Sequence, residues 1–121
     1  MAYDDNNIFA KILRGEIPCN KIYEDEFVLS FYDINPQKKI HALVIPKGKY
    51  VDLDDFSQNA SSEEMVGLLK GINIVARKLN ISVDTGKGYR ALANISEDGG
   101  QEVPHLHFHL FGGEKIGKMV S

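Results

Sequence analysis

The segment HLHFHLF at positions 105–111 constrains the fold of this chain more than any other stretch of its sequence. Histidine and apolar residues alternate in it, and side chains of a β-strand point to opposite faces in turn. The three histidines therefore share one face, and the apolar residues between them share the other. Because the apolar face must be buried, the sequence predicts a strand over 105–111 whose histidines face a cleft, the solvent or a second surface.

Two helices are indicated by capping residues and by apolar spacing. Asn6 or Asn7 can cap a short helix over residues 8–13, which a glycine at position 15 ends. A serine at 61 and a glutamate at 64 form a capping-box pattern, and apolar residues then recur at helical spacing as far as Leu79. The second helix is therefore long and has one wide apolar stripe.

The remaining apolar runs predict four further strands, over 22–23, 27–32, 41–46 and 89–93. The order is a short helix, three strands, a long helix and two strands. This order favours an α+β fold: a mostly antiparallel five-stranded sheet with one long helix packed on it and a short N-terminal helix. With 121 residues, 43% of them hydrophobic, we expect a single domain over residues 1–121.

Charge and cysteine content restrict the partners and the compartment. Fourteen basic and 17 acidic side chains give a formal charge of −3, so a nucleic-acid polymer is not an expected partner. No apolar stretch is long enough to span a membrane, and the polar N-terminus does not resemble a secretory signal. The single cysteine, Cys19, favours a reducing compartment, and we therefore expect a cytoplasmic protein.

Three histidines on one strand face suit two kinds of chemistry. Neutral imidazoles at this spacing can bind zinc or another transition metal, with His41, Asp33 or Glu102 as a fourth ligand. Alternatively, a neutral imidazole can attack a phosphoryl group and form a covalent intermediate that water cleaves. The glycine-rich loop at 99–103 favours phosphate, since its backbone N–H groups and the amide of Asn94 can donate to an anion.

The chain as a whole resembles the histidine triad (HIT) nucleotide-binding proteins, whose signature alternates histidine and apolar residues as HLHFHLF does. The resemblance extends to IFAKILRGEIP, SFYDINPQ, HALVIPK and NISEDGGQEVPH, in this order along the chain. It is strongest to the small bacterial-type purine nucleoside phosphoramidase branch. The resemblance implies a HIT-like fold, a homodimer and no cofactor or metal.

The resemblance also implies a role for each histidine. His107 matches the nucleophile, and the backbone carbonyl of His105 matches the group that fixes its tautomer. His109 matches the histidine that contacts the α-phosphate, and His41 matches a fourth histidine behind the site. The implied reaction is hydrolysis of the P–N bond of purine nucleoside 5′-monophosphoramidates through a nucleotidyl-histidine intermediate.

A nucleotide pocket follows from the same resemblance. Asp33 matches the acidic residue that accepts both ribose hydroxyls, although its sequence context alone is typical of a turn. The apolar walls around the base match Ile8, Phe9, Phe31 and Ile34. The phosphate cradle matches Asn94 and the backbone around Gly100, Glu102 and Val103. Animal members have a serine where this chain has Glu102, so only the backbone contact is expected there.

Three other functions remain open from the sequence. A dinucleoside polyphosphate hydrolase would use the same residues on a related substrate. A nucleotide-binding regulatory module would keep the pocket with little turnover, since one fold hosts many uses. A metal protein would use His105, His107 and His109 as ligands.

Overall fold

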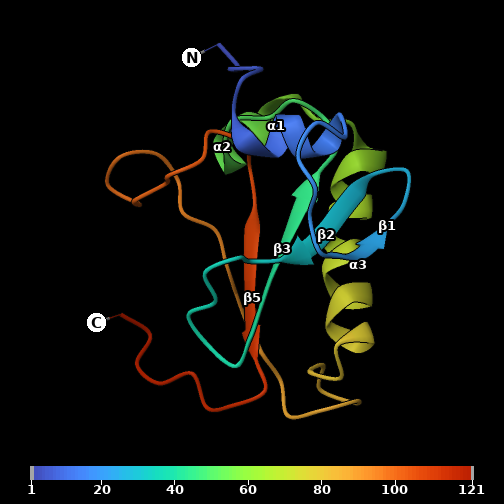
Figure 1. Ribbon diagram of the computed structural model, residues 1–121, viewed down its shortest axis with the longest axis vertical. Helices are drawn as coiled ribbons and strands as arrows, with labels where there is room; N and C mark the ends of the chain where they lie inside the picture. Colours follow the sequence, from blue (N-terminus) through green and yellow to red (C-terminus); the bar gives the residue numbers. More distant parts are fainter. Residues whose placement is uncertain (1, 121) are drawn as a thin grey trace.

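The computed structural model describes residues 2–120, and these form a five-stranded antiparallel sheet with helices around it (Figure 1). The strand order is β1-β2-β3-β5-β4. The strands are β1 (Lys21–Glu24), β2 (Val28–Tyr32), β3 (Ile40–Pro46), β4 (Arg90–Leu92) and β5 (Phe108–Gly112). The helices are α1 (Ile8–Leu13), α2 (Leu53–Asn59) and α3 (Ser62–Lys78). The predicted α+β class is confirmed.

The long helix α3 begins where the capping-box pattern predicts it. The Ser61 hydroxyl accepts a hydrogen bond from the Glu64 N–H at 3.1 Å, and the Glu64 carboxylate accepts one from the Ser61 N–H at 3.0 Å. A β-carbon added at Gly71 would lie 2.8 Å from a methyl group of Val28 on β2. The helix therefore lies directly on the sheet, as the ribbon also shows (Figure 1).

The sheet has a core on each face. The first lies under α3 and includes the fully buried Val44, Val75 and Leu110. The second lies on the opposite face, against α1, and is formed by Phe9, Leu29, Phe31, Leu43 and Ile45. Alternate residues of the central strand β3 thus face different cores, which explains why residues 41–46 are apolar almost throughout.

Strand β5 begins at Phe108, three residues later than predicted. Val44 of β3 pairs with Phe108, and ahead of this pair the N–H of Leu106 donates to the carbonyl of Tyr50 instead of a neighbouring strand. His105 and His107 therefore precede the strand. The alternation persists nevertheless, because Leu106 and Leu110 both lie in the core beneath α3.

The helix α2 is absent from the sequence prediction. Asp52 caps it by accepting a hydrogen bond from the Asp55 N–H at 2.8 Å. Its seven residues are mostly polar, and Phe56 is the one that is buried, against Tyr50 at a ring-centroid distance of 5.1 Å. Two turns with one buried residue give too little periodicity for a sequence pattern to detect.

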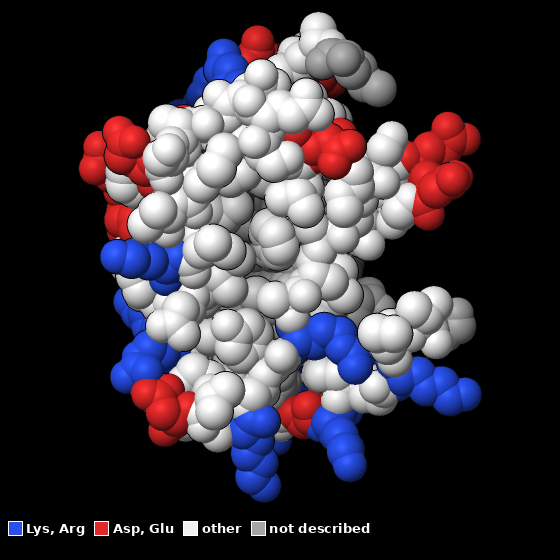
Figure 2. Space-filling model, turned by 180° about the vertical axis from the view of Figure 1, so that it is seen from behind, with Lys and Arg blue, Asp and Glu red and all other residues white. Residues whose placement is uncertain are grey.

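Charged side chains on the back of the molecule lie mainly around its margin (Figure 2). Lys and Arg gather toward the lower end of this view, whereas its centre is formed by uncharged residues. None of the helices within residues 2–120 has the length and apolar character that a membrane crossing requires.

The contact between α3 and the sheet predicts how two valine substitutions should differ. Val75→Ala removes two methyl groups from a fully buried site, and we expect it to lower the free energy of unfolding by about 2 kcal/mol. Val83→Ala, at a site that is 87% exposed, should change it by less than about 0.5 kcal/mol. Urea denaturation of the two variants measures the difference, and equal effects would contradict this packing.

Candidate active site

A cavity of about 320 Å³ opens on the α1 side of the sheet. It is lined by residues of helix α1, the turn after β2, strand β3, the loop over residues 94–103, and β5 with the segment that precedes it. Its lining residues are Phe9, Asp33, Asn35, Gln37, His41, Leu43, Asn94, Gly100, Glu102, Val103, His107 and His109. Segments far apart in the sequence thus meet at one site.

Most of the predicted site residues line this cavity, but four do not. His105 lies behind it and is fully buried. Phe31 packs edge-on against Phe9 in the second core, at a centroid distance of 5.6 Å. Ile8 and Ile34 are 42% and 85% exposed, outside the cavity. The sequence prediction did not include Asn35, Gln37 and Leu43, which also line it.

The tautomer of His107 follows from one hydrogen bond. Its Nδ1 lies 2.7 Å from the carbonyl oxygen of His105. A carbonyl can only accept, so Nδ1 carries the proton and Nε2 keeps its lone pair. Nε2 of His107 has no hydrogen-bond partner among the described residues. Every fully buried side-chain nitrogen among these residues does have a partner, so this Nε2 is accessible from the cavity. The lone pair therefore faces the cavity.

A second hydrogen-bond chain sets the tautomers of His41 and His109. The backbone N–H of Gln37 donates to Nδ1 of His41 at 3.1 Å, so the proton of a neutral His41 is on Nε2. This Nε2 lies 2.9 Å from Nδ1 of His109 and donates to it. His109 consequently carries its own proton on Nε2. The cavity wall thus presents a lone pair on His107 and an N–H donor on His109.

Burial keeps all four histidines neutral at neutral pH. It lowers the pKa of His105 and His109 to about 4, and it also lowers the pKa of His41 and His107. The carboxylates of Asp33 and Glu102 act in the opposite direction on the pKa of His107, but burial outweighs them. A neutral His107 is the form that can act as a nucleophile or a metal ligand.

The loop over residues 94–103 is fixed by the side chain of Gln101. Its Nε2 donates to the carbonyls of Val51 and Val103 at 2.7 and 3.0 Å, and its Oε1 accepts from the N–H of Ser96 at 3.0 Å. Gly100 has a φ of +74°, and its N–H donates to the carbonyl of Glu97. That N–H is therefore engaged within the loop.

The backbone N–H groups of Glu102 and Val103 have no such partner among the described residues. Both residues line the cavity, together with Asn94. The free backbone donors at this wall are therefore two and three positions after Gly100, because the N–H of Gln101 donates to the carbonyl of Ser96.

Asp33 is both a turn residue and a wall of the cavity. Its Oδ1 accepts a hydrogen bond from the N–H of Asn35 at 2.8 Å, and its Oδ2 lies 3.5 Å from Nε2 of His41. Among residues 2–120, the potential metal-binding atoms of Asp33, His41 and His109 converge within 4.8 Å, whereas the three triad histidines form no such group. The sequence spacing suggests His105, His107 and His109 as metal ligands, whereas the fold brings together Asp33, His41 and His109.

The model of the HIT domain matches residues 14–116 of this chain. The chain belongs to the HIT family. This confirms the resemblance carried by HLHFHLF, and in this HIT protein two histidines of that segment, His107 and His109, line the cavity. The match covers 103 of the 121 residues, and every residue that lines the cavity except Phe9 lies within it.

Relatives of this HIT protein match over nearly their whole length. It is 54% identical to an uncharacterized 13.2 kDa HIT-like protein of Azospirillum brasilense, over 98% of this chain and 95% of the relative. It is 38% identical to a purine nucleoside phosphoramidase of Escherichia coli K12, over 97% and 95% of the two chains. The structure of a HIT family hydrolase from Clostridium thermocellum superposes with a TM-score of 0.85 at 37% identity, covering 98% and 99%. This chain is accordingly a HIT family hydrolase.

The buried histidines predict that stability decreases as the pH falls below 6.5. Their pKa values are lowered in the folded chain, to about 4 for His105 and His109, so the unfolded chain binds more protons between pH 6.5 and 4. Each histidine should contribute a slope of up to about 1.4 kcal/mol per pH unit there. Urea denaturation between pH 7.5 and 5 measures it.

A His109→Gln variant serves as the comparison, because it removes one titrating group and should reduce the slope between pH 6.5 and 5. Carboxylates with a lowered pKa, such as Glu24 at about 2, lose their contribution only below their ordinary value of 4.5. Most of the measured window lies above that value, and the contribution that the carboxylates share in both proteins cancels in the comparison with His109→Gln. Stability that stays constant from pH 7.5 to 5 would contradict the neutral, buried histidines.

Proposed function

We propose that this protein hydrolyses purine nucleoside 5′-monophosphoramidates through a covalent bond between phosphorus and Nε2 of His107. The observation behind the proposal is the hydrogen bond from Nδ1 of His107 to the His105 carbonyl at 2.7 Å, which leaves Nε2 unprotonated toward the cavity. The 38% identity to a protein named purine nucleoside phosphoramidase supports the substrate class.

The reaction has two displacements at the same phosphorus. In the first, the lone pair of His107 Nε2 forms a bond to phosphorus while the bond to the amine nitrogen breaks. The amine keeps the electron pair and takes up one proton. In the second, a water oxygen attacks, the bond to Nε2 breaks, and the water releases one proton. The sum is hydrolysis to a nucleoside monophosphate and an amine, with His107 restored.

The phosphate is held by donors of the cavity wall. The Nε2–H of His109, the side-chain amide of Asn94 and the free backbone N–H groups of Glu102 and Val103 supply them. Fixed donors at the phosphoryl oxygens stabilise charge as it develops in the transition state. Gly100 shapes the loop in this proposal, since its own N–H is engaged with Glu97.

The ribose and the base occupy the outer side of the cavity. The carboxylate of Asp33 accepts both ribose hydroxyls, and the ring of Phe9 contacts the base. The exposed side chains of Ile8 and Ile34 are covered by the base when substrate binds. Phe31 supports this wall from behind through its contact with Phe9.

We also propose that the single domain acts in the cytoplasm as a homodimer. Strand β4 lies at one edge of the sheet, so one side of it is available for pairing with a second copy. The resemblance to the bacterial-type branch supports the same assembly.

The nucleophile is tested by His107→Ala, which removes the attacking nitrogen. We expect hydrolysis of adenosine 5′-monophosphoramidate to fall at least about 1,000-fold, since the covalent route is lost. Rapid quenching and mass spectrometry of the wild type should find a nucleotidyl group on His107. Val83→Ala is the control and should behave like the wild type. Near-normal activity of His107→Ala would contradict the assignment.

The role of Asp33 is tested by pairing Asp33→Asn with a substrate that lacks both ribose hydroxyls. Loss of a charge-assisted hydrogen bond should lower kcat/KM for the ribose substrate about 10- to 100-fold. With the 2′,3′-dideoxy substrate, the wild type and the variant should differ much less. An equal loss on both substrates would indicate that Asp33 acts through His41 and not on the ribose.

A further inference from the structure

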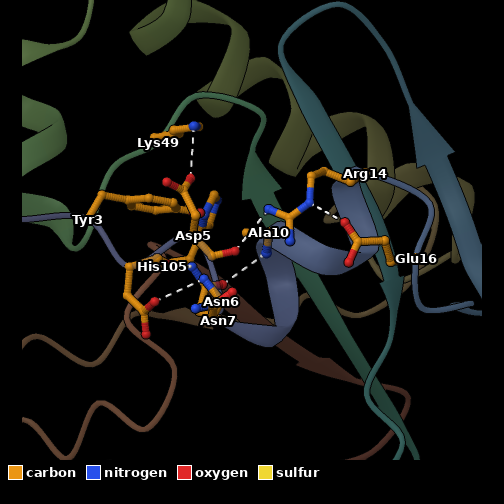
Figure 3. A network of polar contacts seen from close by, with 10 residues as sticks. Tyr3, Asp5, Asn6, Asn7, Ala10, Arg14, Glu16, Lys49 and His105 are labelled. Carbon is orange, nitrogen blue, oxygen red and sulfur yellow. Dashed lines mark hydrogen bonds and ion pairs between the residues drawn. The ribbon is translucent and has the colours of Figure 1, made fainter.

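The N-terminal segment over residues 3–7 places a tyrosine against the first histidine of the triad (Figure 3). The Tyr3 hydroxyl lies 2.6 Å from Nδ1 of His105, and the two rings meet edge-on at a centroid distance of 5.6 Å. Tyr3 is outside the cavity lining and outside the part of the chain that matches the HIT model. Its contact joins the segment ahead of α1 to the site.

The direction of this hydrogen bond follows from the other nitrogen of the ring. Nε2 of His105 lies 2.8 Å from the carbonyl oxygen of Pro46, which can only accept, so Nε2 carries the proton. Nδ1 therefore has a lone pair, and the Tyr3 hydroxyl donates to it. Tyr3 and Pro46 thus hold the His105 ring from both of its nitrogens.

His105 transmits this restraint to His107 through its own backbone. Its side chain is fully buried, and its carbonyl is the acceptor for Nδ1–H of His107 at 2.7 Å. A ring held at two points restricts the rotation of the residue, and with it the direction of that carbonyl. Two hydrogen bonds, one to Nδ1 of His105 and one from Nδ1 of His107 to the His105 carbonyl, therefore link the Tyr3 hydroxyl to the His107 ring.

The segment that carries Tyr3 is anchored at Asp5 and Asn7 (Figure 3). The Asp5 carboxylate pairs with the Lys49 ammonium at 2.8 Å, and the Asp5 carbonyl accepts from Arg14 at 2.9 Å. The Asn7 side chain accepts from the Ala10 N–H at 2.9 Å and caps α1. These contacts fix the path of the chain between Tyr3 and α1.

We propose that Tyr3 is a positioning residue for the hydrolysis, whose hydroxyl keeps the His105 carbonyl directed at Nδ1 of His107. The catalytic consequence rests on the proposed function, whereas the effect on the tautomer does not. Without the hydroxyl, Nδ1 of His105 loses its donor and the residue gains freedom. His107 then spends more time with Nε2 protonated, a form that cannot attack phosphorus.

The test is Tyr3→Phe, which keeps the ring and removes only the hydroxyl. We expect kcat to fall about three- to tenfold, as for the loss of one neutral hydrogen bond, with little change in KM. The ¹⁵N chemical shifts of the imidazole nitrogens report the tautomer of His107 directly. They should show a larger fraction with Nε2 protonated in the variant.

Tyr23→Phe is the matched control. The Tyr23 hydroxyl also makes one side-chain hydrogen bond, to Asp25 at 2.7 Å, and Tyr23 lies on the edge strand β1, which β2 and β3 separate from β5. It should leave kcat and the His107 shifts unchanged. Equal losses of kcat in both variants, or unchanged His107 shifts and kcat in Tyr3→Phe, would overturn the proposal.

The measurements also separate the two proposals from each other. If the wild type does not hydrolyse the phosphoramidate but the His107 shifts move in Tyr3→Phe, the effect of Tyr3 on the His107 tautomer is supported and the proposed function is contradicted. If His107→Ala abolishes hydrolysis but Tyr3→Phe changes neither kcat nor the shifts, the function stands and the role of Tyr3 is overturned.

Discussion

The chemistry of this site depends on the burial of four imidazoles, each neutral and each with one defined tautomer. Burial makes the charged form costly, and carbonyl or N–H partners decide which nitrogen holds the proton. The carbonyl of His105 does so for His107, and the backbone N–H of Gln37 does so for His41 and, through it, for His109. The acceptor nitrogen of His107 and the N–H donor of His109 therefore face the same cavity while both rings stay neutral.

The sheet provides the geometry for this arrangement. His41 on β3 is paired with Phe111, and His109 with Leu43, so the two histidines lie diagonally across neighbouring strands and their rings meet. The opposite face of the same strands is fixed by the core under α3. Because a slip of one residue would exchange the two faces, the packing of Leu110 also determines where His109 points.

The alternation in HLHFHLF predicted that Leu106 and Leu110 are buried on one face and that His107 and His109 face the site on the other. It did not predict that His105 lies behind the cavity and is fully buried. It could not predict where β5 begins, because this depends on where β3 ends and on a hydrogen bond to the distant Tyr50. Gln37 was not predicted as a site residue, since its contribution is a backbone N–H and any residue type has one. Tyr3 gave no signal either, because its partner is 102 positions away.

On the proposed function, the phosphate side and the base side of the substrate site differ in how far they are formed before substrate binds. The phosphate end is bordered by imidazoles with fixed partners and by a loop that Gln101 holds through three hydrogen bonds. On the base side, Ile34 lies outside the cavity and is 85% exposed. Fixed donors stabilise a transition state because they need no rearrangement, whereas apolar contacts discriminate weakly between bases. On the proposed function, the chain should therefore be demanding about the reacting phosphorus and tolerant about the base.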